Sequence, residues 1–428
     1  MATLTERAHE SVVTWRDRRR YAYVLGLSVP LLPFGAKNLV DATGLEVFWY
    51  FGPLSIVVLM PLVDTLVGTN GENPPDWAFD QLTQDRYYRV LTYLFAPLQY
   101  VGFFWSMWMV ATAELSLFAR IGLTLTAGAV GGIGIANAHE LGHKKERIER
   151  RLAKVVLAQT GYGHFVVEHN RGHHARVATP EDPASARLGE SFWTFLPRSV
   201  IGAARSGWRL ESARLRHKGR SPFRLDNDVL NAWLLTVALF TAMTAVLGVG
   251  VLPFLVLQAV YGCSLLEVVN YLEHYGLLRQ KDDSGRYERC RPRHSWNSDH
   301  IVSNIVLYGL ERHSDHHANP TRRYQTLRTF DEAPQLPSGY GLMIALAYVT
   351  PLWRRVMDPR VLALYDGDAT KANLSPRLAR RHCGRDNHVV ADLTVGQLEA
   401  PSAGDTVGTV GTGAQAVRPS GPPPIRAR

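Results

Sequence analysis

Cysteine is scarce in this sequence of 428 residues: Cys263, Cys290 and Cys383 are the three cysteines, and no two of them form a Cys-x-x-Cys pair. This scarcity argues against a disulfide framework, a zinc ribbon, and an iron–sulfur or rubredoxin-type site within the chain. Charge is also low, since charged residues make up 20% of the chain, against roughly 25% in soluble domains. The net charge of +9 favours an anionic membrane surface or an acidic partner over nucleic acid, because apolar spans interrupt the basic residues.

Long runs without any charged residue occupy positions 21–36, 47–63, 90–113, 121–138 and 229–266. About 20 apolar residues are needed to cross a bilayer as a helix. The last run is long enough for two spans, with a break near 248–253. The sequence therefore predicts an all-α integral membrane protein with six transmembrane helices in three hairpins. A soluble protein with buried helices is disfavoured, because such helices rarely continue as long as 90–113 without a charge.

The polar segments suggest how the chain is organised around these spans. We expect a cytoplasmic N-terminal segment at 1–20, a six-span membrane domain at 21–366, and a largely disordered tail at 367–428 that is rich in Gly, Pro, Ala and Thr toward its end. With six spans, the basic loops all fall on one side, which is the cytoplasmic side by the positive-inside rule. The same rule places both termini and a helical cap in the cytoplasm.

Histidine is the most unusual feature of the sequence, with sixteen copies. Nine of them lie in four short clusters beside the predicted spans: His139, His143, His169, His173, His174, His274, His313, His316 and His317. Imidazole is a common ligand for iron, zinc or copper. Because one ion takes four to six ligands, nine histidines predict a site for two metal ions at the boundary between membrane and cytoplasm.

Other interpretations of these histidines are less consistent with the sequence. His139-Glu140-Leu141-Gly142-His143 is an HExxH motif, which in a zinc hydrolase would use Glu140 as the general base. That mechanism needs one zinc ion and leaves six clustered histidines without a role. A metal transporter would place ionisable residues inside the spans, which are nearly free of them. Isolated histidines such as His217 are more typical of solvated helix ends. His294 could form a hydrogen bond with a histidine that binds the metal and so orient its ring.

Longer stretches around these histidines resemble a known family. NAHELGHKKE, GYGHFVVEHNRGHHARVATPEDPASARLGES, NYLEHYGLLRQ and LERHSDHHANPTRRYQTLR are similar to the membrane-bound alkane monooxygenases, within the membrane fatty-acid desaturase/hydroxylase superfamily. The resemblance covers roughly residues 20–365, and NYLEHYGL is its most discriminating element. One departure is Glu311, where the family pattern has glutamine.

The resemblance implies an enzyme of a bacterial-type inner membrane that uses O2 to hydroxylate the terminal methyl of medium- or long-chain n-alkanes. It implies two iron ions held by the nine clustered histidines, with Glu140, Glu168, Glu273 and Asp315 orienting imidazoles or steering protons. A fatty-acyl desaturase or hydroxylase and an aromatic side-chain monooxygenase of the same superfamily remain open as alternatives. The alkane, which has no polar group, is expected to enter from the lipid.

The reaction also needs two electrons from outside the chain. By the resemblance, the donor is a separate rubredoxin, reduced by an NAD(P)H-dependent rubredoxin reductase. A basic cytoplasmic surface is a candidate for docking this acidic donor: Lys144, Lys145, Arg147, Arg150, Arg151 and Lys154. Candidates for the wall of a substrate tunnel are Ile56, Leu59 and Phe104.

Overall fold

The structure is a computed structural model that describes residues 15–382 of the chain. Within this range, six helical segments are long and apolar enough to cross a membrane: Arg20–Thr43, Glu46–Val67, Arg86–Thr112, Leu117–Gly142, Asp228–Leu247 and Val249–His274. Four isolated bridges are the only β-structure among the described residues. The predicted all-α fold with six spans is confirmed: each of the first four charge-free runs largely overlaps one of these segments, and the run 229–266 covers most of the last two.

The first two spans change their helical winding along their length. The first joins a 3-10 helix, η1 (Arg20–Leu31), to α1 (Leu32–Thr43), and the second joins η2 (Glu46–Tyr50), α2 (Phe51–Leu54), the π-helix η3 (Ser55–Leu59) and α3 (Met60–Val67). The third and fourth spans are the single helices α5 (Arg86–Thr112) and α6 (Leu117–Gly142).

The predicted break in the long apolar run at 229–266 is present. Helix α11 (Asp228–Leu247) ends at Gly248, whose φ of 85° is readily adopted only by glycine. A single 3-10 turn, η6 (Val249–Val251), then leads into α12 (Leu252–His274), which begins with Pro253 in its first turn. The two helices therefore form the third hairpin of the membrane region.

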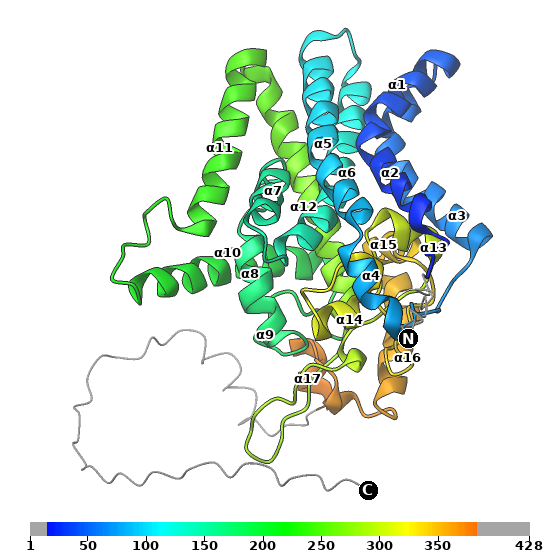
Figure 1. Ribbon diagram of the computed structural model, residues 1–428, viewed down its shortest axis with the longest axis vertical. Coiled ribbons are helices and arrows are strands. Elements are labelled where there is room, and N and C mark those ends of the chain that lie inside the picture. Colours follow the sequence, from blue (N-terminus) through cyan, green and yellow to red (C-terminus); the bar gives the residue numbers. More distant parts are fainter. Residues whose placement is uncertain (1–14, 383–428) are drawn as a thin grey trace, which may run out of the picture. The chain divides into compact units, whose positions relative to one another are not determined.

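Helices α6 and α12 form the centre of the bundle, where Figure 1 shows them between the other spans. Their backbones approach closely at Gly128 and Gly132, four residues apart on α6. A Cβ atom at Gly132 would lie 2.8 Å from Leu265 Cδ1, and one at Gly128 would lie 2.7 Å from the carbonyl oxygen of Gln258. Such glycine spacing is typical of tightly packed membrane helices. This close contact fixes the two helices that carry His139 and His274 at their ends.

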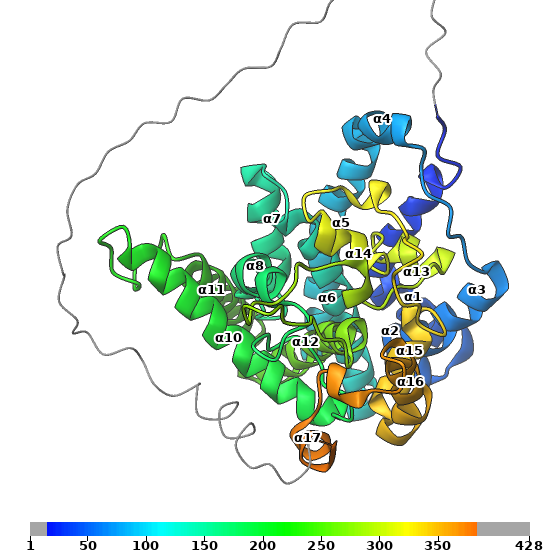
Figure 2. The same ribbon diagram turned by 90° about the horizontal axis from the view of Figure 1, so that it is seen from below.

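Most of the remaining helices gather at one end of the spans, toward the bottom in Figure 1 and facing the viewer in Figure 2. The longer ones are α10 (Phe192–Arg216), α15 (Tyr340–Tyr348) and α16 (Thr350–Leu364). Helix α7 (Arg147–Ala158) instead runs back beside α6, where the Gln159 side chain that follows it donates to the Ala127 carbonyl at 3.1 Å. Short helices carry or flank the histidines: α8 (Phe165–Glu168), η5 (His169–His173), α9 (His174–Arg176), α13 (Ile301–Val306) and α14 (His313–Ala318). Helix α4 (Phe79–Gln84) joins the second and third spans at this end.

Part of the predicted tail is helical. Residues Ala369–Lys371 form η9 and Pro376–His382 form α17. The Leu188 amide donates to the Asn373 carbonyl at 2.6 Å, and the Ser375 amide donates to the Leu188 carbonyl at 3.0 Å. These bonds hold the segment against the cap. The rest of the predicted tail, from residue 383, lies outside the described residues, as does most of the predicted N-terminal segment.

Candidate metal centre

Five of the nine predicted histidines converge in one group of buried and half-buried side chains, which we call the five-histidine cluster: His139, His143, His169, His174 and His316. They come from the end of α6 and from η5, α9 and α14. The Nε2 atom of His169 lies 2.9 Å from that of His139 and 3.1 Å from that of His174. The Nε2 atoms of His174 and His316 are also 3.1 Å apart.

The other four form a second buried group, the four-histidine cluster: His173, His274, His313 and His317. The Nε2 atom of His313 lies 3.2 Å from that of His274 and 2.9 Å from that of His317. The two clusters adjoin, because the rings of His174 and His317, one from each cluster, have centroids 4.5 Å apart. The structure therefore brings all nine predicted histidines together, in two neighbouring sets.

This spacing fits metal ions. A divalent metal that holds imidazole nitrogens at roughly 2.1 Å places neighbouring ligand nitrogens about 3.0 to 3.4 Å apart. Neutral imidazoles whose lone pairs face one another at such distances repel, and a cation between them removes the repulsion. In addition, Nε2 of His143 and Nε2 of His173 are buried and have no hydrogen-bond partner among the described residues. Buried polar atoms are rarely left unpaired, so these nitrogens fit ligand positions.

Burial also keeps these imidazoles in the form that binds metal. Burial, together with the neighbouring histidines, lowers the pKa of His174 to about 3 and the pKa of His316 well below its usual value. A neutral imidazole keeps a free lone pair for a metal. His173 is different, because the Asp182 carboxylate and Glu168 outweigh the effect of burial and raise its pKa.

The winding of η5 decides how its histidines divide between the clusters. In a regular α-helix, His169 and His173 would lie on the same face, as residues four apart do. However, η5 is a π-helix, in which the hydrogen bonds join residues five apart. His169 and His174 therefore share a face and join the five-histidine cluster, whereas His173 turns toward the other one. Such π-turns occur frequently at functional sites.

The four carboxylates expected beside the ligands take different positions. Glu140 pairs with Lys144 at 3.0 Å, Glu168 with Arg176 at 3.0 Å, and Asp315 with Arg322 at 2.7 Å. Each of these three ion pairs joins residues within nine positions of each other in the chain, so it stabilises the local fold of a ligand-bearing segment. Glu273 alone among the four contacts a ring, with Oε2 lying 3.2 Å from Nε2 of His313. Its Oε1 accepts a hydrogen bond from Tyr340 at 2.9 Å.

A further carboxylate, Asp182, was missed by the sequence analysis. Its Oδ2 lies 2.8 Å from Nδ1 of His173, the nitrogen that faces away from the cluster, and it also accepts from Ser185 at 2.7 Å. A carboxylate that accepts from the far nitrogen of a histidine ligand fixes both its tautomer and its orientation. Asp182 follows His173 by nine residues in an irregular segment, so no helical spacing points to it. The backbone carbonyl of His294 plays the same part for Nδ1 of His274, at 3.2 Å.

Glu311, the departure from the family pattern, is fully buried behind this site. Its Oε1 accepts from the Tyr340 amide at 2.8 Å, and its Oε2 accepts from the Asn304 side chain at 3.2 Å. Burial, with the nearby Asp64 carboxylate, raises the pKa of Glu311 well above its usual range. Glu311 therefore ties α15 to the segment that carries His313.

Comparison with known proteins identifies the family. The fatty acid desaturase family matches residues 115–347. The chain is 46% identical over 360 residues to Alkane 1-monooxygenase 1 of Alcanivorax borkumensis, spanning 84% of this chain and 89% of that protein. It is 43% identical over 364 residues to Alkane 1-monooxygenase of Acinetobacter baylyi, again spanning 84% and 89%. The chain belongs to the alkane 1-monooxygenase family.

This alkane 1-monooxygenase family member also resembles, over a shorter range, the xylene/toluene monooxygenase hydroxylase component XylM of Pseudomonas putida. The two are 28% identical over 219 residues, which is 50% of this chain and 57% of XylM. The predicted family is thus confirmed, and the chain is a multi-pass membrane protein.

An apolar cavity lies on the membrane side of the histidines in this family member. Its walls come from the second span, α6, α12, α15 and the segment before α14: Ile56, Met60, Gly132, Ile133, Ala136, Leu265, Leu266, Val269, Leu307, Leu310 and Ile344. Ala136 and Leu310 each precede a clustered histidine by three residues, about one helical turn on α6. The cavity therefore leads from the membrane interior toward both clusters.

The three predicted tunnel residues divide between this cavity and the outer surface. Ile56 is 4% exposed and lines the cavity. Leu59 and Phe104 do not belong to its wall and are 45% and 43% exposed. Both point outward from their helices, where lipid contact explains their apolar character. Of the two spans that carry the candidates, the second contributes Ile56 and Met60 to the cavity wall, whereas α5, which carries Phe104, contributes no residue to it.

The predicted docking residues divide in a similar way. Lys144 is buried, pairs with Glu140 and donates to the Arg322 carbonyl. Lys154 is half-buried and pairs with Asp228 at 2.6 Å. Neither is free to meet a partner. The other four, which we call the α7 basic face, are exposed and form no ion pair within residues 15–382: Lys145, Arg147, Arg150 and Arg151.

Proposed function

We propose that this protein is a di-iron alkane 1-monooxygenase that converts medium- or long-chain n-alkanes to 1-alkanols with O2 and two external electrons. The observation that carries the proposal is the pair of adjoining imidazole clusters beneath an apolar cavity. A terminal C–H bond is strong and unpolarised, so acid–base groups alone cannot activate it. A bound iron pair supplies the redox chemistry for O2 activation, while the protein positions the methyl group and excludes water.

Two iron ions match the division of the ligands into five and four, and the all-nitrogen donor set suits iron. A zinc hydrolase is less consistent with the site, because Glu140 pairs with Lys144 and accepts from the Tyr324 amide instead of facing open space. The experiment is to purify the full chain, measure its metal content, and identify the product from an alkane. Two irons per chain and a 1-alkanol support the proposal, whereas one zinc or an alkene product contradicts it.

An alkane can be held in the cavity by apolar contact alone. Burial of each methylene contributes about 0.8 kcal/mol, so a medium-length chain gains several kcal/mol when it leaves water. Because the wall comes from membrane-spanning helices, we propose that the substrate enters from the lipid and places its terminal methyl beside the histidines.

The XylM likeness favours testing an aromatic methyl group as a second substrate class, with xylene as the probe.

Substitution of Ile56 by tryptophan is expected to shorten the preferred substrate. Ile56 is buried in the cavity wall, and a larger ring there would fill space needed by the distal end of a long chain. Competition between octane and hexadecane should therefore shift toward 1-octanol by at least several-fold. Phe104→Trp, on the outward face of α5, is the matched control and should leave the product ratio unchanged. An unchanged ratio in Ile56→Trp would remove this residue from the tunnel.

For the electron donor we propose a separate, acidic rubredoxin that docks on the α7 basic face. Charged surfaces of opposite sign accelerate and orient such encounters. The triple variant Arg147→Gln/Arg150→Gln/Arg151→Gln is expected to raise the KM for rubredoxin several-fold and to weaken its salt dependence, because these charges steer the encounter. Steady-state turnover at two ionic strengths measures both effects.

The matched control is Lys281→Gln/Arg289→Gln, which removes exposed cations from a loop that extends away from the spans in Figure 1. It should behave as the parent protein does. If the KM for rubredoxin is unaltered in the α7 variant, the donor docks elsewhere.

We also propose that this face, both termini and the histidine clusters lie on the cytoplasmic side of the inner membrane, as the distribution of basic loops favours.

A further inference from the structure

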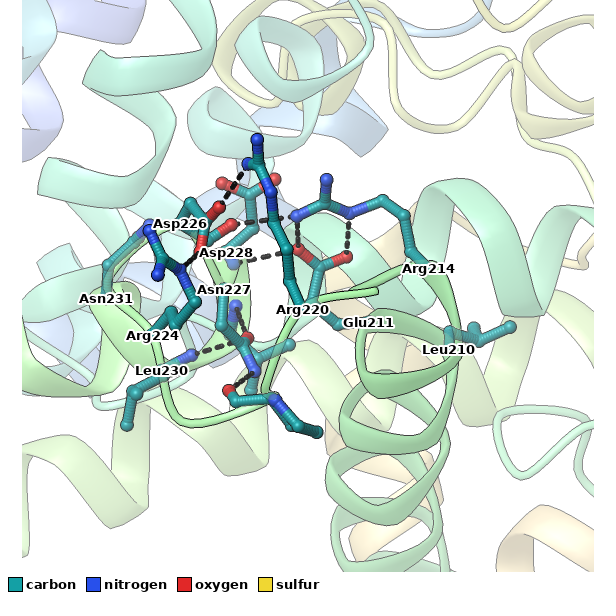
Figure 3. A network of polar contacts seen from close by, with 12 residues as sticks. Leu210, Glu211, Arg214, Arg220, Arg224, Asp226, Asn227, Asp228, Leu230 and Asn231 are labelled. Carbon is teal, nitrogen blue, oxygen red and sulfur yellow. Dashed lines mark hydrogen bonds and ion pairs between the residues drawn. The ribbon is translucent and has the colours of Figure 1, made fainter. Parts of the chain in front are cut away.

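The connection between α10 and α11 is strongly basic. From residue 205 to residue 226 the chain carries seven Lys and Arg side chains and two acidic ones. Both acidic groups are already paired, as Figure 3 shows: Glu211 pairs with Arg214, and Asp226 pairs with Arg220 at 2.8 Å. Glu211 also pairs with Arg171 at 2.8 Å. Four exposed cations remain without an ion pair among residues 15–382, and we call them the α10 cations: Arg205, Arg209, Arg216 and Lys218.

Large apolar side chains stand among these cations. Phe223 is 78% exposed and Leu225 is 73% exposed, which are among the highest values for large hydrophobic residues in the described chain. Trp208 packs near Phe223, with ring centroids 5.5 Å apart, and stacks on Trp233 of α11 at 6.0 Å. Exposed apolar side chains gathered in one place mark a surface that meets a membrane or another macromolecule.

The position of this connection relative to the membrane follows from α11. That helix begins at Asp228 and has 20 residues, which at 1.5 Å per residue matches the roughly 30 Å hydrocarbon core. Phe223 and Leu225 lie a few residues before its first turn, so they stand at the level of the lipid headgroups. Figure 1 shows α10 running crosswise to α11 at this same end. Aromatic and basic residues concentrate at this depth in membrane proteins.

We propose that the α10 cations and the apolar side chains of Phe223 and Leu225 form a binding site for anionic phospholipid headgroups. The cations would contact the headgroup phosphates, and the two apolar side chains would enter the upper part of the acyl region. An acidic soluble protein could also pair with the charges, but Phe223 and Leu225 lie just before the first residue of a membrane span, where lipid headgroups are their neighbours. The combination therefore favours lipid over a protein partner.

Hydrogen bonds would connect such a site directly to the segment that carries the clustered histidines. Arg171 of η5 donates to Glu211 and to the Leu210 carbonyl, both at 2.8 Å, and Arg176 donates to Ser206 at 2.7 Å. These bonds hold the segment with His169 and His173 against α10. Asn227 continues the connection by capping α11, with its side chain accepting from the Val229 and Leu230 amides at 3.0 Å (Figure 3). Lipid bound at α10 is therefore expected to stabilise the ligand segment.

The experiment compares phosphatidylglycerol and phosphatidylcholine as probes on the purified full-length protein. Native mass spectrometry of detergent-solubilised protein, titrated with equal amounts of the two lipids, measures how much of each is retained. The parent is expected to prefer phosphatidylglycerol by about tenfold, a ratio that a few headgroup-contacting cations can supply. The variant Arg205→Gln/Arg209→Gln/Arg216→Gln/Lys218→Gln should lose most of this preference, and Phe223→Ser/Leu225→Ser should retain less of both lipids.

The control Lys281→Gln/Arg289→Gln should keep the parental preference. Unchanged helical circular dichroism and metal content show that each variant is folded. Equal lipid preference in the parent and the quadruple variant would overturn the proposal. It would also be overturned if the quadruple variant kept its lipid preference but raised the KM for rubredoxin in phosphatidylcholine nanodiscs, because the surface would then be a protein site. The lipid measurement is independent of turnover, so its outcome is separate from that of the proposed function.

Discussion

Replacing His313 by alanine is expected to abolish alkane hydroxylation and to remove one of two metal ions. His313 sits within the four-histidine cluster, with Nε2 atoms of His274 and His317 at 3.2 and 2.9 Å. Replacing a residue that only hydrogen-bonds a metal ligand already lowers metal affinity or activity by about 10- to 100-fold. Removing a ligand itself should therefore lower activity by more than about 100-fold. Metal analysis of the purified variant should show close to one iron per chain.

His217→Ala is the matched control, because His217 is exposed at the end of α10 and belongs to neither cluster. It should retain two irons and the parental rate. Retention of both metals and of 1-alkanol formation in His313→Ala would contradict the assignment of the four-histidine cluster as a metal site. Loss of metal with unaltered helical content would separate a missing ligand from a misfolded protein.

Asp182→Asn is expected to lower metal affinity and turnover by about 10- to 100-fold. The carboxylate accepts from Nδ1 of His173 at 2.8 Å, and this bond directs Nε2 toward the cluster. An asparagine has nearly the same shape but removes the negative charge and can turn its NH2 group toward the ring, which would disfavour the required tautomer. Because Asp182 acts through His173, metal release during a chelator titration should accelerate together with the loss of turnover.

Glu181→Gln provides the neighbouring control, since Glu181 is exposed and has only a long contact to Tyr287, at 3.4 Å. It makes the same change of charge one residue away. If Asp182→Asn held its metals as tightly as Glu181→Gln does, the carboxylate would be a packing element and not a positioning residue for His173. Asp182→Glu tests the geometry, because it keeps the charge but shifts it by one methylene.

Much of the architecture could be predicted because it depends on simple periodic rules. The charge-free run 90–113 had to be a spanning helix, since a buried soluble helix rarely lacks charge for so long, and Gly248 marked a turn that other residues would resist. The clustered histidines converge because each lies beside the same end of the spans. Hydropathy and spacing carry this information directly.

Other features depend on contacts between segments distant in the chain. The division of His169 and His173 between clusters follows from a π-turn, which spacing in a regular helix does not predict. Asp182 is recognisable only when its segment folds back on His173, and Lys144 loses its docking role because it turns inward to Glu140. Leu59 was a reasonable tunnel candidate, but only packing decides which face of the second span meets the cavity.

The adjacency of His173 and His174 has a consequence for assembly of the enzyme. These neighbours in the chain serve different clusters, so a single peptide unit joins the two proposed metal sites. An ion bound at one site would fix torsion angles that the other site requires, which would reduce the entropy lost when the second ion binds. Uptake of iron by the metal-free parent protein should therefore be cooperative, with fewer half-loaded molecules than two independent sites would give.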